Sequence, residues 1–314
     1  GIRDVERSRG LGDVYKRQMK KDAALVFSTG FQTNQGTIAP LALKGDTVFC
    51  DRENHASIFD ACRLSFANTK KFVHNDMANL EEMLHNDTDA RGGRLIVVDG
   101  VFSMSGDVSN LPEIAKLKEK YNCKLMVDDA HGIGVLGEHG RGTAEHFDVE
   151  DKVDIVMGTF SKSFASLGGF IVSEADVIHY IKHHSRALIF SASIPPANVA
   201  SVIASLDIIQ KEPERIQRLH DTAKKMRNGF KEMGFRVPDG ITPIIPVFIG
   251  ELQDSFNFCK KLLENGVFAT PIVPPAVPED QTLVRTSYMS SHTDEQLDRV
   301  LEIFERLGKE LAVI

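Results

Sequence analysis

The chain has 314 residues, enough for one large domain or two smaller ones, and its apolar content of 42% and charged content of 26% are ordinary for a globular protein. A formal net charge of -7 without a basic run gives no support to nucleic-acid binding. The four cysteines form no CxxC pair, which suggests neither a disulfide framework nor a zinc site and favours a cytoplasmic location, and no apolar run approaches the ~20 residues of a membrane span.

The first eighteen residues differ from the rest of the chain. Gly1–Gln18 is rich in Arg and Asp, lacks an apolar period and ends just before Met19. We therefore expect residues 1–18 to be a non-native or disordered leader, such as a read-through or a cloning remnant. The recognisable protein would then begin at Met19, within a domain.

A strand, a turn and a helix are predicted next. The apolar run 23–27 leads into Ser28-Thr29-Gly30-Phe31, and a helical pattern covers 33–43. A Gly at such a turn lets backbone N–H groups converge on an anion, aided by the helix dipole, although an ordinary tight turn is the alternative. A second strand, 47–50, ends in a segment that contains His55.

A regular rhythm follows, in which apolar runs recur about every 30 residues, at 95–99, 125–128 and 154–157. An amphipathic helix is predicted at 111–121, and this alternation indicates a mostly parallel sheet covered by helices on both faces. Each run is followed by polar residues: Ser103, Asp128–His131 and Thr159–Lys162. Because ligands bind beyond the carboxyl ends of such strands, we expect one shared site.

The break Lys211-Glu212-Pro213 marks a predicted boundary between a large domain, 19–210, and a small C-terminal α+β domain, 211–314. Before it, a helix is predicted at 197–209. The small domain is predicted to contain helices 213–233 and 255–265, strands 244–249 and 283–287, a Pro-rich loop 271–278, and a last helix with a capping box at 293–296.

Lys162 and Asp128 are the central candidates for chemistry. Burying an ammonium is costly, so a lysine at the end of a buried strand suggests a reactive amine suited to Schiff-base formation; a surface lysine in a turn is the alternative. Asp128-Asp129-Ala130-His131 is not a helicase acidic box, because the chain lacks a GxxxxGK[ST] loop. A metal site from Asp128, His131 and His139 has no clear completing ligands. A pyridoxal phosphate site remains, with Lys162 holding the aldehyde and Asp128 the ring nitrogen.

The chain resembles the α-oxoamine synthases, fold-type I pyridoxal phosphate enzymes, from Met19 to Ile314. The motifs that carry the resemblance occur in the family's order and spacing: Ser28–Phe31, Asn54–Ser57, Asp99–Met104 with Gly106-Asp107, Val127–Gly132, Gly140-Arg141-Gly142 and Thr159–Lys162.

The resemblance implies a role for each matching residue. Lys162 would bind the cofactor covalently, Asp128 would pair with the pyridine nitrogen, His55 would stack on the ring, and His131 and Ser103 would lie near the phenolic oxygen. The resemblance also implies contacts with the phosphate and with the substrate carboxylate. The phosphate would be held by Gly30, Phe31, Thr159 and Ser161. Ser191 would reach the phosphate of a partner subunit in a homodimer, and Arg285 would take the amino-acid carboxylate.

Thr159–Ser163, Phe190–Ser193 and Arg285–Met289 resemble the serine palmitoyltransferase branch. That branch condenses L-serine with a long-chain acyl-CoA to 3-oxosphinganine, CoA and CO2 in sphingolipid biosynthesis. Two alternatives stay open: a relative that uses glycine or alanine, such as 8-amino-7-oxononanoate synthase or 2-amino-3-oxobutyrate CoA ligase, and a non-catalytic partner subunit. Family members carry a segment before Met19 that this chain lacks, so we expect an N-terminally truncated protein.

Overall fold

The computed structural model describes residues 2–87, 92–274, 277 and 281–314. Two compact units are present: Gly1–Phe102 with Val108–Pro213, and Ser103–Asp107 with Glu214–Ile314. The boundary predicted after residue 210 lies a few residues before Pro213. Residues 103–107 belong to the second unit, which the predicted single boundary did not include.

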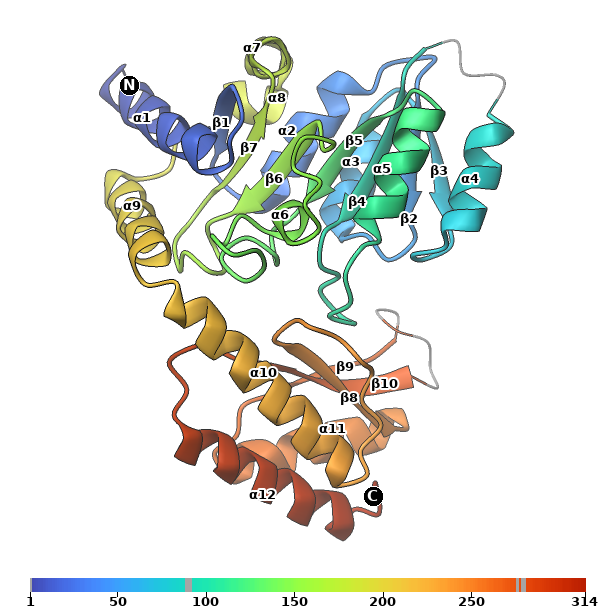
Figure 1. Cartoon of the computed structure of the whole chain (residues 1–314), viewed down its shortest axis with the longest axis vertical. Coiled ribbons are helices and arrows are strands. Elements are labelled where there is room, and N and C mark those ends of the chain that lie inside the picture. Colours follow the sequence, from blue (N-terminus) through green and yellow to red (C-terminus); the bar gives the residue numbers. More distant parts are fainter. Residues whose placement is uncertain (1, 88–91, 275–276, 278–280) are drawn as a thin grey trace. The chain divides into compact units, whose positions relative to one another are not determined.

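The N-terminal unit is built on a seven-stranded sheet (Figure 1). Its order is β1-β7-β6-β5-β4-β2-β3, and neighbouring strands are parallel except in the pairs β1–β7 and β6–β7. The strands are β1 Ala23–Phe27, β2 Thr47–Asp51, β3 Asn68–Phe72, β4 Arg94–Asp99, β5 Lys124–Asp128, β6 Ile155–Thr159 and β7 Gly169–Ser173. The prediction of a mostly parallel sheet is confirmed, and β7 is the reversed strand.

Helices cover both faces of this sheet. Successive strand residues point to opposite faces, and since both sets of side chains are apolar, each face is buried by helices. In β4, Ile96 and Val98 join one apolar cluster and Val97 the other. The first cluster includes residues of α1 Ile2–Gln18, α4 Met77–His85, α5 Leu111–Lys120 and α9 Pro196–Lys211. The second includes residues of α2 Gly30–Leu41, α3 Ala56–Leu64 and α7 Ala175–His184; α6 Thr143–His146 and α8 Arg186–Ile189 are single turns.

The N-terminal segment is a helix, so the expectation of a disordered leader is wrong. Leu11 and Tyr15 of α1 are fully buried. The Tyr15 ring lies 4.2 Å from that of Phe170 and 5.1 Å from that of Phe160, between ring centroids. Burial of these two large side chains accounts for the order. That the segment is foreign to the fold remains a prediction.

Helix α2 begins three residues earlier than the predicted start at Thr33, and the cause is its N-cap. Thr29 has extended backbone, and its Oγ1 accepts a hydrogen bond from the Gln32 N–H at 3.1 Å. Gly30 and Phe31 therefore form the first turn, where backbone N–H groups have no partner within the helix.

The C-terminal unit is a three-stranded antiparallel sheet with three helices. The strands, in the order β8-β10-β9, are β8 Ile244–Gly250, β10 Thr282–Ser287 and β9 Thr270–Ile272. The helices are α10 Glu214–Glu232, α11 Leu252–Glu264 and α12 Asp294–Glu310. The predicted capping box at Thr293 is confirmed. The predicted Pro-rich loop begins with β9, and its residues 275–276 and 278 lie outside the described residues.

No helix in the described part of the chain is both long and apolar enough to cross a bilayer.

Candidate active site

The site lies at the carboxyl ends of β4, β5 and β6. Asp99 and Asp128 are register partners on β4 and β5, and Asp128 is also paired with Met157 on β6. Strand β6 leads directly into Ser161 and Lys162. The polar clusters predicted after β5 and β6 thus share one edge of the sheet, whereas Ser103, the third, belongs to the C-terminal unit.

Asp128 is buried and held by two donors. The Asn34 side-chain nitrogen donates to its Oδ2 at 2.6 Å, and the Ala130 N–H donates to its Oδ1 at 3.1 Å. Both bonds orient the carboxyl group. A charged carboxylate held in this way can receive a cation, such as a protonated pyridine nitrogen.

His55 caps helix α3 and connects it to Asp99. Its backbone N–H donates to Asp99 Oδ2 at 2.9 Å, and its Nδ1 lies 2.8 Å from Ser57 Oγ. Burial lowers the pKa of His55, the Asp128 carboxylate opposes this shift and the Lys162 ammonium adds to it. The imidazole is therefore neutral at physiological pH, as suits a ring that stacks on another ring.

Asp99 is a second buried carboxyl beside Asp128. Burial raises the pKa of Asp99 well above its usual range, and the Asp128 charge raises it further, against the opposing effects of the His55 N–H and Lys162. Burial therefore favours the protonated form of Asp99 more than in an exposed carboxyl. The Lys162 ammonium lowers the pKa of both His55 and Asp99.

The first turn of α2 and the end of β6 together form a cradle suited to an anion. A Cβ added at Gly30 would lie 2.8 Å from Thr159 Oγ1, so the backbone and this hydroxyl meet only because residue 30 is Gly. Thr159 Oγ1 and Ser161 Oγ are 3.0 Å apart. Hydroxyl groups beside helix N–H groups match a phosphate, so the residues present fit pyridoxal phosphate.

The remaining predicted residues are less tightly placed. Lys162 is exposed to solvent, so its amine is not desolvated by the protein alone. His131 is half-buried in the turn after β5. Ser191 Oγ accepts from the Gln32 side-chain nitrogen of its own chain at 3.0 Å, next to the first turn of α2. Its contact with a partner subunit's phosphate stays a prediction.

Arg285 and Ser103 form a contact within the C-terminal unit. Arg285, on β10, donates from Nε to the Ser103 carbonyl at 2.6 Å. Burial lowers the pKa of Arg285. With Nε engaged, the two Nη groups are the donors suited to a carboxylate.

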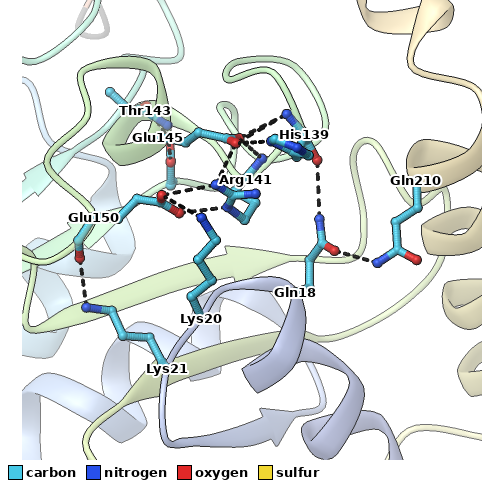
Figure 2. Close-up of polar contacts among 10 residues, drawn as sticks. Gln18, Lys20, Lys21, His139, Arg141, Thr143, Glu145, Glu150 and Gln210 are labelled. Atoms are coloured by element: carbon cyan, nitrogen blue, oxygen red, sulfur yellow. Dashed lines mark hydrogen bonds and ion pairs between the residues drawn. The ribbon is translucent and has the colours of Figure 1, made fainter.

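Arg141, for which the sequence suggested no role, holds the loop after β5 (Figure 2). Its Nε and Nη2 donate to the two oxygens of Glu150 at 2.7 and 3.0 Å, and Nη2 lies 2.7 Å from Glu145 Oε1. Glu145 Oε1 also lies within hydrogen-bond distance of His139 Nδ1, at 2.7 Å. His139 is thus part of this network, and no three His, Cys, Asp or Glu side chains among the described residues are placed to hold a metal.

The same loop is attached to Asp129. Thr143 donates to the buried Asp129 carboxyl from its backbone N–H at 2.5 Å and from Oγ1 at 2.6 Å. Burial raises the pKa of Asp129 to about 7, and the two Thr143 bonds oppose that shift. Asp129 therefore anchors the loop, and its neighbour Asp128 faces the site.

Sequence reasoning missed Asn34, Ser57 and Asp99 as members of the site. The available signal was the buried face of α2, where Thr33, Asn34 and Thr37 are fully buried polar residues. Polar groups in such positions are retained only with hydrogen-bond partners, which the sequence alone does not identify.

A reversed strand in a mostly parallel sheet, with a lysine after one strand and a carboxylate after its neighbour, defines the fold-type I class of pyridoxal phosphate enzymes. The family model for aminotransferase class I and II matches residues 9–304, and the chain belongs to that family. The resemblance predicted from the motifs is confirmed by the individual relatives.

A serine palmitoyltransferase of Bacteriovorax stolpii is 51% identical over 288 residues, which are 92% of this chain and 69% of the relative. An 8-amino-7-oxononanoate synthase of Alkaliphilus metalliredigens is 43% identical over 295 residues, 94% of this chain and 75% of the relative. Among solved structures, a serine palmitoyltransferase of Sphingomonas wittichii has a TM-score of 0.95 at 35% identity, covering 98% of this chain and 78% of that one. A serine palmitoyltransferase solved with pyridoxal phosphate has a TM-score of 0.94 at 33% identity, covering 99% and 78%.

Proposed function

We propose that this protein is a pyridoxal phosphate-dependent C-acyltransferase of sphingolipid biosynthesis. It condenses L-serine with a long-chain acyl-CoA, such as palmitoyl-CoA, to 3-oxosphinganine, CoA and CO2. The observation that carries the proposal is the identity of 46–51% to several serine palmitoyltransferases over most of the chain. Lys162, Asp128 and His55 are all present at one sheet edge, as catalysis requires.

Pyridoxal phosphate, when bound, stabilises negative charge at the amino-acid Cα by withdrawing electrons from it. Asp128 would hold the ring nitrogen protonated, and the neutral His55 ring would pack against the cofactor ring. Thr159, Ser161 and the first turn of α2 hold the phosphate. The contacts of Asp128, His55, Thr159 and Ser161 within the N-terminal unit support these proposed roles.

Lys162 moves the substrate proton. With the cofactor bound, the Lys162 amine would accept the Cα proton of serine and could return a proton later. Arg285 binds the serine carboxylate through its Nη groups, and His131 polarises the thioester carbonyl. The support for Arg285 is its fixed guanidinium, held through Nε by Ser103.

The substrate is tested by CO2 release and absorbance. The purified protein with pyridoxal phosphate is expected to change its visible spectrum on addition of L-serine, and to release CO2 when palmitoyl-CoA follows. A relative at 43% identity, 8-amino-7-oxononanoate synthase, supports glycine or alanine as second candidates. A response to glycine or alanine and none to serine would identify that amino acid as the substrate instead. No turnover with any of the three would favour a non-catalytic partner subunit, although Lys162 is present.

The active form is a homodimer with the site at the subunit interface, and it resides in the cytoplasm. Phe190, beside Ser191, is 82% exposed and Ile189 is 50% exposed, which is unusual for large apolar side chains and favours a partner surface. The free thiols of all four cysteines favour a reducing compartment. Recovery from the periplasm in cell fractionation would contradict that location.

Phe190→Asp is expected to shift the protein from dimer to monomer in analytical ultracentrifugation, because a charge replaces an interface aromatic. Phe256→Asp is the matched control, since Phe256 is exposed on α11 of the C-terminal unit. A Phe190→Asp protein that stays dimeric would contradict this interface.

A further inference from the structure

Asn34 is a fully buried amide that links the two groups expected to contact the cofactor ring. Its side-chain nitrogen donates to Asp128 Oδ2 at 2.6 Å and to Ser57 Oγ at 2.8 Å. Ser57 Oγ in turn lies 2.8 Å from His55 Nδ1. One amide group thus spans the distance between the carboxylate and the imidazole.

The amide orientation follows from charge. With the opposite orientation, Asn34 Oδ1 would face the Asp128 carboxylate, and two acceptors would repel each other. The amide nitrogen must therefore face Asp128, and both of its hydrogens are used. Asn34 Oδ1 has no hydrogen-bond partner among the described residues, although it is buried.

A buried carbonyl without a partner costs free energy, so Asn34 does not stabilise the fold in the way that an apolar residue would. Helix propensity does not favour Asn at this position either, because Asn is a poor residue for a helix interior. The position is better explained by the two bonds that Asn34 donates than by packing.

These bonds give the hydrogen-bond chain a direction. The Ser57 backbone N–H points to His55 Nδ1 at 3.3 Å, and an N–H can only donate, so Nδ1 is an acceptor. Since Nδ1 is an acceptor, the Ser57 hydroxyl 2.8 Å away donates its hydrogen to it, and Ser57 Oγ accepts from Asn34. The imidazole proton is then on Nε2.

We infer that Asn34 is a positioning residue that fixes the Asp128 carboxylate and, through Ser57, the Nε2–H tautomer of His55. It acts through other side chains and needs no contact with the cofactor. The expected effect on cofactor binding rests on the proposed function. The His55 tautomer can be measured in the protein without cofactor.

The test is Asn34→Leu, which has a similar volume and no donor. Its dissociation constant for pyridoxal phosphate is expected to rise about ten- to a hundred-fold, the usual effect of losing a hydrogen bond to a charged group. The matched control is Thr37→Val, one turn along α2, because Thr37 is equally buried and its Oγ1 donates to the Thr33 carbonyl of the same helix.

The second readout is ¹⁵N NMR of the His55 ring without cofactor, assigned by comparison with His55→Gln. The wild type and Thr37→Val are expected to show the Nε2–H form, and Asn34→Leu a mixture of tautomers. Ser57→Ala removes the 2.8 Å contact of Oγ with Nδ1 and keeps the longer bond, 3.3 Å, from the backbone N–H, so it is expected to lower the fraction of the Nε2–H form. It keeps the test valid if Asn34→Leu does not fold.

An unchanged His55 spectrum in Ser57→Ala or Asn34→Leu would overturn the inference, as would an Asn34→Leu affinity equal to that of Thr37→Val. If the wild type binds no pyridoxal phosphate, the proposed function fails, and the NMR result still decides whether Asn34 sets the tautomer.

Discussion

Lys162→Ala is expected to abolish covalent attachment of pyridoxal phosphate and to lower kcat about a thousand-fold or more. The variant loses the amine that binds the cofactor and also the base that moves the Cα proton, and a positioned base alone is worth about 10²- to 10⁴-fold. Because Asp128 and the cradle at α2 are unchanged, the variant is expected to keep noncovalent binding.

Borohydride reduction followed by mass spectrometry measures the attachment. The wild type is expected to carry the reduced cofactor on the peptide that contains Lys162, and Lys162→Ala to carry none. Lys260→Ala is the control, because Lys260 is an exposed lysine of α11. Turnover by Lys162→Ala near the wild-type rate would rule out the assigned chemistry.

Arg141→Leu is expected to lower the free energy of unfolding by about 3 kcal/mol, as expected when one partner of a buried ion pair is removed. Arg141 is 7% exposed and contacts two carboxylates, Glu145 and Glu150. Leucine fills part of the space but leaves both carboxylates without the guanidinium. The loop after β5 would then lose its main attachment near Thr143.

Urea unfolding of Arg141→Leu, Arg141→Lys and Arg306→Leu provides the comparison. Arg306 is an exposed arginine of α12 that donates to Asn265 at 2.6 Å, so its loss is expected to cost at most about 1 kcal/mol. The free energy of unfolding of Arg141→Lys is expected to lie between those of the other two variants, since lysine keeps the charge but not the forked geometry. Equal stability of Arg141→Leu and Arg306→Leu would show that the network contributes little.

The sequence predicted the strands that carry the site because buried β-branched runs and the residues after them are local patterns. Asp128 and Lys162 could be selected in this way, and β5 and β6 lie side by side as expected. The reversal of β7 could not be predicted, because an apolar run such as Phe170–Val172 has the same composition in either direction.

The hydrogen bonds between these elements were beyond sequence reasoning. The link from Asn34 to Asp128 spans 94 positions, and the link from Arg285 to Ser103 spans 182. Each depends on where tertiary packing places two side chains, which no periodicity encodes. The helix at residues 2–18 was missed for a related reason, because the burial of Leu11 and Tyr15 depends on packing against distant parts of the chain.

The short segment Ser103–Asp107 limits how this protein can be recombined with its relatives. Its carbonyl groups accept from two residues of the C-terminal unit: Ser103 O from Arg285, and Gly106 O from Thr242 Oγ1 at 2.5 Å. The polypeptide consequently passes between the units at three places along its length. A chimaera made with a single crossover near Pro213 would join a foreign Arg285 to a native Ser103. Exchange of substrate preference between relatives therefore requires that residues 103–107 and 214–314 be inherited together.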